Sequence, residues 1–192
     1  FLIAFGKTVA FLSLNSYHPF WLNVFFINYT FIGDGIFALC LIAVLYFYFK
    51  HKKLATSLIY AFISSGLVVQ IIKNLIHSPR PKLFFESGQY LFFIDGVTHS
   101  GKNSFPSGHT ANTTALIVSV VLVVWCVVEV SHRTKTLISI SGAMVIIAMS
   151  LSRLLLNVHW LSDVLAGWCI GAAVGLAVTG LLVAVRPLNF DA

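Results

Sequence analysis

The sequence predicts an all-α integral membrane protein, a helical bundle of about six transmembrane helices. Of its 192 residues, 58% are hydrophobic and only 9% are charged, and the mean hydropathy is +0.93. An average soluble domain is about 25% charged, so this chain has too few charged side chains to cover a water-exposed surface. Apolar runs long enough to cross a bilayer recur along the chain, and basic residues stand between them.

Five apolar runs approach the roughly 20 residues that a helix needs to cross a bilayer. They lie near 35–50, 54–77, 109–130, 136–156 and 161–185. Residues 1–14 are expected to belong to another span. They lack an initiator Met and a signal-peptide cleavage pattern, so we interpret them as the remainder of a longer first helix. The aromatic-rich stretch 17–30, interrupted by Pro19, suits an interfacial segment. We find no linker and expect residues 1–192 to form a single membrane-embedded domain.

The basic residues between the spans predict the orientation of the bundle. When the spans alternate, "KHKK" (50–53), "HRTK" (132–135) and Arg186 fall at one end, which is expected to be cytoplasmic. The segments 78–108 and 157–162 then lie at the other end. That end faces the periplasm or the extracellular side of the plasma (inner) membrane of a bacterium, which the short bundle suggests as the source.

Charge and cysteine content exclude other classes of protein. The net charge of +6 is explained by membrane topology, because the basic residues are scattered among apolar runs, and no nucleic-acid partner is expected. Three cysteines lie in apolar segments without CxxC spacing: Cys40, Cys126 and Cys169. We expect buried free thiols there rather than a disulfide framework or a zinc site.

The first polar cluster is "KNLIHSPRP", residues 73–81. Lys73 lies near the end of an apolar run, and Arg80 follows Pro79, which disfavours continuation of the helix. A lysine that snorkels to the interface and an arginine that meets lipid headgroups would explain this cluster on its own.

The second cluster is "SFPSGHT", residues 104–110. Pro106 and Gly108 suit a turn, Ser107 suits an N-cap, and a helix continues from His109. A helix N-terminus offers unpaired N–H groups and the positive end of a dipole, both of which favour an anion. His109 adds a proton donor there. An ordinary capped helix start with an incidental histidine explains the same residues equally well.

The third cluster is "SRLLLNVHWLSD", residues 152–163. Arg153 lies near the end of a span, where a charge is costly unless it is paired or faces water. His159 and Asp163 are four residues apart and share a face if they are helical, so the carboxylate can fix the tautomer of the imidazole. The alternative is an Arg153–Asp163 ion pair with His159 at the water interface.

Together the clusters place two arginines, a lysine, two histidines and an aspartate at one end of the bundle. This set suits phosphoryl transfer: cations hold the non-bridging oxygens, one imidazole attacks phosphorus, and another protonates the leaving oxygen. A soft metal site is less favoured, because its candidate ligands would be two His and one Asp crowded by three cations.

The three clusters together resemble the tripartite signature of the type 2 phosphatidic acid phosphatases (PAP2). The motifs read Lys73-(six residues)-Arg80-Pro81, Pro106-Ser107-Gly108-His109 and Ser152-Arg153-(five residues)-His159-(three residues)-Asp163. All three are complete, in order and correctly spaced across residues 73–163, and the surrounding spans fit the family's six-helix bundle, with the site at its periplasmic ends.

The resemblance implies a role for each motif residue. The phosphate would be bound by Lys73, Arg80, Ser107, Gly108 and Arg153. His159 would be the nucleophile that forms a phosphohistidine, with Asp163 hydrogen-bonded to its other ring nitrogen. His109 would protonate the leaving group, and water would then release phosphate. The family requires no metal ion or other cofactor.

The implied activity is hydrolysis of a phosphomonoester or pyrophosphate on a membrane lipid. The motifs leave four substrates open: undecaprenyl pyrophosphate, phosphatidylglycerophosphate, phosphatidate and lipid A phosphate. One alternative is a phosphotransferase of the same family that passes the phosphoryl group to a second lipid. Another is an anion or lipid transporter, which would spread polar residues across the membrane depth rather than gather them at one end. The oligomeric state does not follow from the motifs.

Other features receive weaker expectations. Asp34 is expected to cap a span, and His77 and His99 are possible substrate contacts outside the motifs. Gly167, Gly171 and Gly175 favour close helix packing, within the monomer or at a dimer contact. The loop 82–105 either shapes headgroup access or packs over the helix ends. It is rich in aromatic residues: Phe84, Phe85, Tyr90, Phe92, Phe93 and Phe105.

Overall fold

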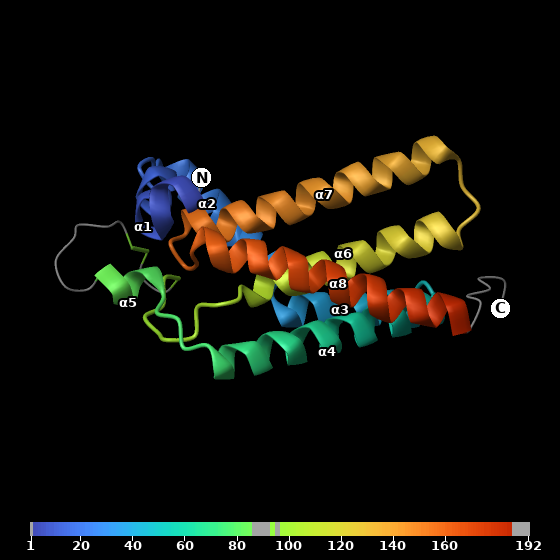
Figure 1. Cartoon of the computed structure of the whole chain (residues 1–192). Helices are drawn as coiled ribbons and strands as arrows, with labels where there is room; N and C mark the ends of the chain where they lie inside the picture. Colours follow the sequence, from blue (N-terminus) through green and yellow to red (C-terminus); the bar gives the residue numbers. More distant parts are fainter. Residues whose placement is uncertain (1, 86–92, 95–96, 186–192) are drawn as a thin grey trace.

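The computed structural model describes residues 2–85, 93–94 and 97–185, and these form helices joined by short connections, with no strand among them (Figure 1). The elements are α1 (Leu2–Leu14), α2 (Phe20–Tyr29), the 3-10 helix η1 (Thr30–Gly33), α3 (Gly35–Phe47), α4 (Lys52–Leu75), α5 (Pro81–Phe85), α6 (Gly108–Cys126), α7 (His132–Leu155) and α8 (Leu161–Val185). The prediction of an all-α membrane bundle is therefore confirmed.

Within the described residues, four helices are long and apolar enough to cross a bilayer: α4, α6, α7 and α8. They match the predicted spans 54–77, 109–130, 136–156 and 161–185 to within a few residues. The predicted span 35–50 differs, because α3 has only 13 residues. Helix α3 and the preceding segment Phe20–Gly33, which contains α2 and η1, form a pair bent by 55°. Together the two segments are long and apolar enough to cross a bilayer. Residues 20–29 thus continue toward α3, and Pro19 occupies the N-cap position of α2.

The centre of the bundle is the contact between α6 and α8 (Figure 1). A Cβ atom on Gly171 would lie 2.3 Å from the carbonyl oxygen of Ala111, so only glycine allows this approach. Gly167 and Gly175 meet backbone carbonyls of α6 in the same way, at 2.9 and 2.8 Å. The glycine repeat therefore packs within the monomer. Since lipid tails are as apolar as the helices, this close packing of the two backbones, rather than the hydrophobic effect, holds α6 and α8 together.

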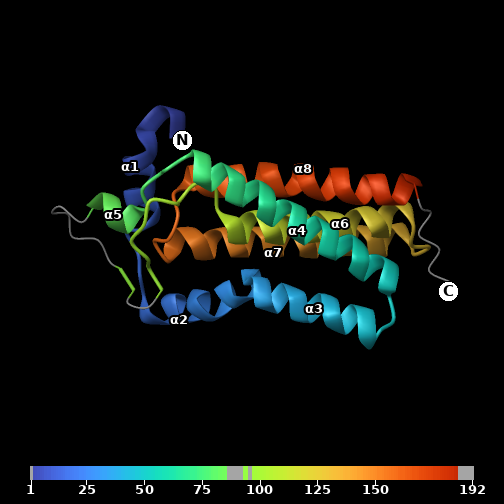
Figure 2. The ribbon, with the colours of Figure 1, turned by 90° about the horizontal axis from the view of Figure 1, so that it is seen from below.

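Helix α1 does not run alongside the long helices. It crosses their direction at the end of the bundle that carries α5 (Figure 2). There Phe11 stacks on Phe85 and packs at a tilt against Trp160, with ring centroids 5.6 and 5.0 Å away. Lys7 lies 4.2 Å from the centroid of the Trp160 ring. The expectation that residues 1–14 form part of a span is wrong for the described residues, because these contacts hold α1 across the bundle end.

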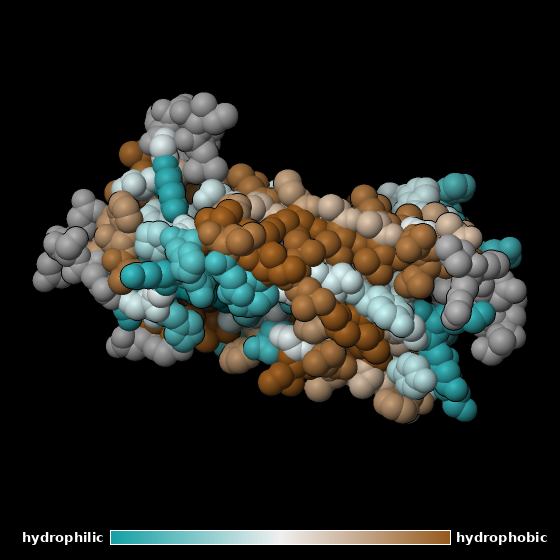
Figure 3. Space-filling model, turned by 60° about the horizontal axis from the view of Figure 1, so that its bottom comes forward, coloured by the Kyte–Doolittle hydropathy of each residue, from teal (hydrophilic) through white to brown (hydrophobic). Residues whose placement is uncertain are grey.

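The two ends of the bundle differ as the sequence predicts. The basic stretch 50–53 spans the α3–α4 connection and the start of α4, and the stretch 132–135 begins α7. Both lie at the end where α8 finishes (Figures 1 and 2). Arg186 lies outside the described residues. The segments that carry the three motifs meet at the opposite end. Figure 3 shows an apolar belt between hydrophilic side chains at both ends, as a bilayer requires.

The expectation that the three cysteines are buried is wrong. Cys40, Cys126 and Cys169 are free thiols, as predicted, but all three are exposed rather than buried. They lie on outward faces of helices, where an apolar side chain meets lipid rather than the bundle interior.

Candidate active site

A cavity of about 370 Å³ lies where the three motifs converge. It is lined by Ile27, Thr30, Phe31, Asp34, Lys73, Arg80, Val97, His99, Gly108, His109, Arg153 and His159. These residues come from the bent pair, the end of α4, the loop after it, the start of α6, the end of α7 and the connection to α8. Segments that are distant in the sequence therefore line one polar cavity.

Three cations line this cavity, and the most deeply buried is Arg153, only 7% exposed. One terminal nitrogen of its guanidinium donates a hydrogen bond to the hydroxyl of Thr30. Its Nε–H is buried and has no hydrogen-bond partner among the described residues. An unpaired buried donor on a charged group is costly, so the arrangement favours an anion that accepts this hydrogen bond.

Two backbone hydrogen bonds hold the segment 78–80, which contains Arg80, against the segment 101–104. The Arg80 amide N–H donates to the carbonyl of Gly101 at 2.8 Å, and the Ser104 N–H donates to the Ser78 carbonyl at 2.9 Å. Burial lowers the pKa of the Arg80 guanidinium, and the carboxylate of Asp163 opposes this effect. The guanidinium still carries its charge at neutral pH, because arginine side chains are not deprotonated in proteins.

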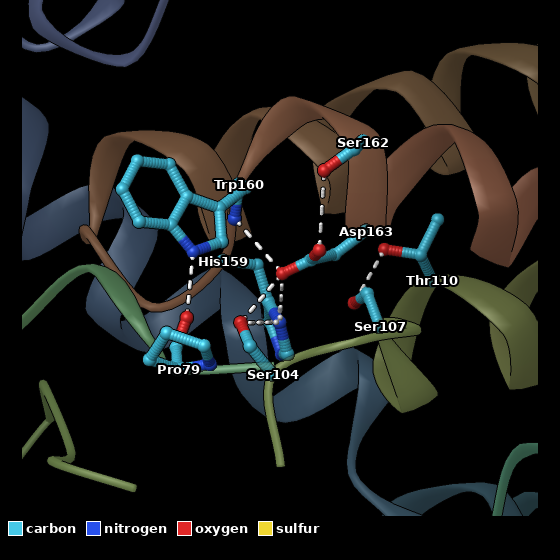
Figure 4. Close-up of polar contacts among 8 residues, drawn as sticks. All are labelled: Pro79, Ser104, Ser107, Thr110, His159, Trp160, Ser162 and Asp163. Carbon is cyan, nitrogen blue, oxygen red and sulfur yellow. Dashed lines mark hydrogen bonds and ion pairs between the residues drawn. The ribbon is translucent and has the colours of Figure 1, made fainter. Parts of the chain in front are cut away.

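His159 lies in the connection between α7 and α8 and is 2% exposed. Its Nδ1 lies 3.4 Å from Oδ2 of Asp163, one helical turn later, and 3.5 Å from the hydroxyl of Ser104 (Figure 4). These partners occupy Nδ1, so Nε2 is the ring nitrogen left for the cavity that His159 lines. A carboxylate on one side and an open cavity on the other suit a nucleophilic imidazole.

The Asp163 carboxylate is fixed by several donors in addition to His159. Ser104 donates to Oδ2 at 2.5 Å, and the Trp160 amide N–H donates to the same oxygen at 3.1 Å (Figure 4). Ser162 donates to Oδ1 at 3.3 Å. These bonds stabilise the ionised carboxylate and hold it against the imidazole.

Burial lowers the pKa of His159 to about 4, and the positive charges of Arg153 and Arg80 act in the same direction. The hydrogen bond and the charge of Asp163 oppose the shift without cancelling it. His159 is therefore neutral at pH 7, and its Nε2 carries a free lone pair, as a nucleophile requires.

The start of α6 forms the third side of the site. Gly108 and His109 are the first helical residues, and both line the cavity. The amide N–H of Ser107 donates to the backbone carbonyl of Asp163 at 3.0 Å, which ties this helix start to α8. Free N–H groups and the positive end of the helix dipole thus face the cavity beside the cations.

The structure gathers most of the predicted residues at one place. Lys73, Arg80, Gly108, His109, Arg153 and His159 line the cavity. Asp163 lies behind His159, and Ser107 occupies the predicted N-cap position of α6. The Ser107 hydroxyl, however, bonds the Thr110 hydroxyl at 2.9 Å, and it caps no backbone N–H.

Three residues that contact the candidate site residues or line the cavity belong to none of the three motifs. Thr30 binds Arg153, Ser104 binds Asp163, and Asp34, expected only to cap a span, also lines the cavity. The sequence held a signal for Ser104 alone, because it lies within the polar stretch 104–110. Of the two histidines outside the motifs, His99 lines the cavity, whereas His77 is exposed and is not among its lining residues.

The described part of the loop 82–105 packs over the helix ends and also reaches the cavity, whereas its role in headgroup access stays a prediction. Phe84 and Phe85 pack on Trp160, with ring centroids 5.4 and 5.9 Å away, so they cover the helix ends. Val97 and His99, further along, line the cavity. Tyr90 and Phe92 lie outside the described residues.

Sequence comparison identifies a family and two curated relatives. The PAP2 superfamily matches residues 54–186. Phosphatidylglycerophosphatase B of Bacillus subtilis is 23% identical over 163 residues, which cover 83% of this chain and 75% of the relative. Lipid A 1-phosphatase of Rhizobium johnstonii is 29% identical over 136 residues, which cover 68% of this chain and 51% of the relative. The match thus spans about half the length of that second protein.

Two crystal structures share the fold. The first transmembrane PAP2 type phosphatidylglycerolphosphate phosphatase from Bacillus subtilis has a TM-score of 0.78 at 21% identity, over 97% of this chain and 89% of that one. Aquifex aeolicus LpxE has a TM-score of 0.72 at 24% identity, over 91% and 94%. The helical arrangement described above is therefore shared with solved membrane proteins.

Proposed function

This chain belongs to the PAP2 superfamily, and from that premise we propose that it hydrolyses a phosphate or pyrophosphate group on a membrane lipid through a covalent phosphohistidine. The resemblance drawn from the three motifs is confirmed, and with it the prediction of a membrane-embedded phosphatase. The observation that carries the mechanism is one cavity lined by three cations and by the buried, neutral His159, whose Nδ1 is held by Asp163.

In the first step, Nε2 of His159 attacks phosphorus while the bond from phosphorus to the lipid oxygen breaks. His109 supplies the proton that the leaving oxygen takes up. Lys73, Arg80 and Arg153 bind the non-bridging oxygens, and their charges offset the negative charge that these oxygens carry in the transition state.

In the second step, water attacks the phosphohistidine, and the bond between phosphorus and nitrogen breaks. His109, now neutral, accepts the proton from this water, so it returns to its starting state. Inorganic phosphate leaves, and His159 is again the neutral imidazole. Asp163 stabilises the positive charge that His159 carries while it is phosphorylated.

Two of the four candidate substrates gain support from the names of the relatives, which are a phosphatidylglycerophosphatase and a lipid A 1-phosphatase. We propose phosphatidylglycerophosphate first, because that relative covers more of this chain. The basic connections favour an orientation in which the site faces the periplasm or the extracellular side of a bacterial inner membrane.

The test is phosphate release by purified protein in detergent with EDTA present. The four candidate lipids are offered to the wild type, to His159→Ala and to His77→Ala, a matched control because His77 is exposed and does not line the cavity. We expect turnover of at least one lipid that His159→Ala abolishes and His77→Ala retains. Rapid quenching with radiolabelled lipid should trap an acid-labile, alkali-stable phosphoenzyme in the wild type and in His77→Ala, but not in His159→Ala.

Other outcomes would contradict the proposal. Activity that EDTA abolishes, or that survives in His159→Ala, would refute the metal-free phosphohistidine route. Label that moves to a second lipid instead of inorganic phosphate would identify a phosphotransferase. Lipid transport without phosphate release would favour a transporter.

A further inference from the structure

The cavity has one acidic residue in its described lining, Asp34, opposite in charge to the three cations that share it. A carboxylate in a phosphate site repels the phosphate that the site binds. Its presence therefore calls for a role that offsets this repulsion.

Helix capping accounts for only one of its two oxygens. Oδ1 of Asp34 accepts a hydrogen bond from the Ile36 amide N–H at 2.8 Å and caps α3. Asparagine and serine serve as well as aspartate at an N-cap, so capping alone does not require a charge. Asp34 makes no ion pair with the described residues, where the one ion pair joins His159 and Asp163. Oδ2 of Asp34 accepts no hydrogen bond from the described residues, and the residue lines the cavity.

Asp34 stands beside the residues that hold the phosphate. It directly follows η1, and the first residue of η1 is Thr30, whose hydroxyl binds Arg153. The same short element thus anchors a phosphate-binding cation at one end and presents a carboxylate at the other. Both residues lie outside the segment 54–186 that the family matches.

We propose that Asp34 selects substrates by accepting a hydrogen bond from a free hydroxyl on the part of the lipid next to the phosphorylated oxygen. The inference rests on the proposed function and specifies its substrate class. Phosphatidylglycerophosphate carries such a hydroxyl on the carbon beside the phosphorylated carbon. Phosphatidate carries none, because its other two glycerol oxygens are acylated.

Burial makes this contact discriminating. Asp34 is half-buried, and a substrate that fills the cavity would exclude water from its carboxylate. A hydroxyl replaces that water, whereas a substrate without one leaves a charged acceptor unsatisfied. Hydrogen bonds to charged groups correspond to roughly a ten- to hundredfold preference.

The experiment compares the wild type with Asp34→Asn, which keeps the cap but replaces the charged acceptor at the cavity by an amide N–H donor. The ratio of kcat/KM for phosphatidylglycerophosphate over phosphatidate is measured for both proteins. We expect this ratio to fall at least tenfold. Glu129→Gln removes the same charge at an exposed position outside the cavity and should leave the ratio unchanged.

Binding separates this inference from the proposed function. The same two lipids are titrated into His159→Ala and into the double variant His159→Ala/Asp34→Asn, and the ratio of their Kd values should shift in the same direction. If Asp34→Asn fails to fold, Asp34→Ser also provides a cap without the carboxylate. Ratios of kcat/KM and of Kd within twofold of the unsubstituted proteins would overturn the role of Asp34. Absence of turnover with a shifted Kd ratio would refute the proposed function and support the role of Asp34.

Discussion

Substitution of Gly171 by alanine tests the contact on which the whole bundle depends. The added Cβ would lie 2.3 Å from the Ala111 carbonyl oxygen and 2.7 Å from the Thr114 Cβ, whereas ordinary contacts begin near 3.4 Å. The difference, 3.4 − 2.3, means that α6 and α8 must separate by about 1 Å. The obstructing atoms belong to backbone and to a Cβ, so no side chain can rotate away.

The magnitude follows from two opposing effects. Overpacking costs about 1–3 kcal/mol, and replacing glycine by alanine inside a helix returns about 0.5–1 kcal/mol. The net loss of about 1–2 kcal/mol should lower Tm by roughly 2–8 °C in a chain of this size. The separation would also stretch the 3.0 Å bond between the Ser107 N–H and the Asp163 carbonyl. A displacement of ~1 Å in a catalytic site can reduce kcat by ~10²-fold.

The assay is thermal unfolding in detergent micelles, followed by circular dichroism, together with phosphate release. Gly66→Ala is the matched control, because it is also a glycine inside a helix and a Cβ there would meet nothing within 4 Å. We expect Gly66→Ala to raise Tm slightly and to retain activity. If Gly171→Ala behaved like Gly66→Ala in both measurements, the close approach of α6 and α8 would be refuted.

Three further predictions concern the site. Ser104→Ala removes the 2.5 Å bond to Asp163 and should lower kcat by roughly 10–100-fold with little change in the Kd of a bound lipid phosphate; an unchanged kcat would exclude a positioning role. Thr30→Val leaves a second N–H of Arg153 unpaired and should raise KM several-fold, while Thr30→Ser keeps the hydroxyl and should retain the wild-type KM. Equal KM values in the two variants would contradict the role of the Thr30 hydroxyl. The pKa of His159 is about 4 in the folded protein and near 6.5 when unfolded, so the unfolded chain binds more protons between these values. The free energy of unfolding should therefore be fully retained above pH 6.5 and fall by about 3 kcal/mol as the pH drops toward 4. His159→Gln should lack this part of the acid sensitivity, and identical pH profiles of Tm for both proteins would refute the shift.

The site residues that the sequence identified share one property: each belongs to a short motif whose chemistry is local. His159 and Asp163 are four residues apart, so helical geometry alone brings their side chains together. Gly108 and His109 follow a turn signal, and the helix start creates the anion-binding end. The alternation of apolar spans places these motifs at the same end as Arg80.

The residues that the sequence missed act through partners distant along the chain. Thr30 meets Arg153 across 123 positions, and Ser104 meets Asp163 across 59. A threonine in an aromatic stretch carries no sign of such a partner, because its hydroxyl can be satisfied in many ways. Asp34 fits its local reading as a cap, and only the packing of the bent pair against α7 adds the cavity.

The sequence by itself determined that the chain lies in a membrane, the approximate spans and the set of candidate site residues, since these follow from hydropathy and from residues close together in the chain. Tertiary structure alone decided which helix receives the glycine face of α8, that α1 crosses the bundle end, and that Thr30 and Asp34 complete the cavity. The physical reason is that hydropathy favours burial in lipid for every apolar helix face equally. Only close steric fit and specific hydrogen bonds then select the faces that pack against each other.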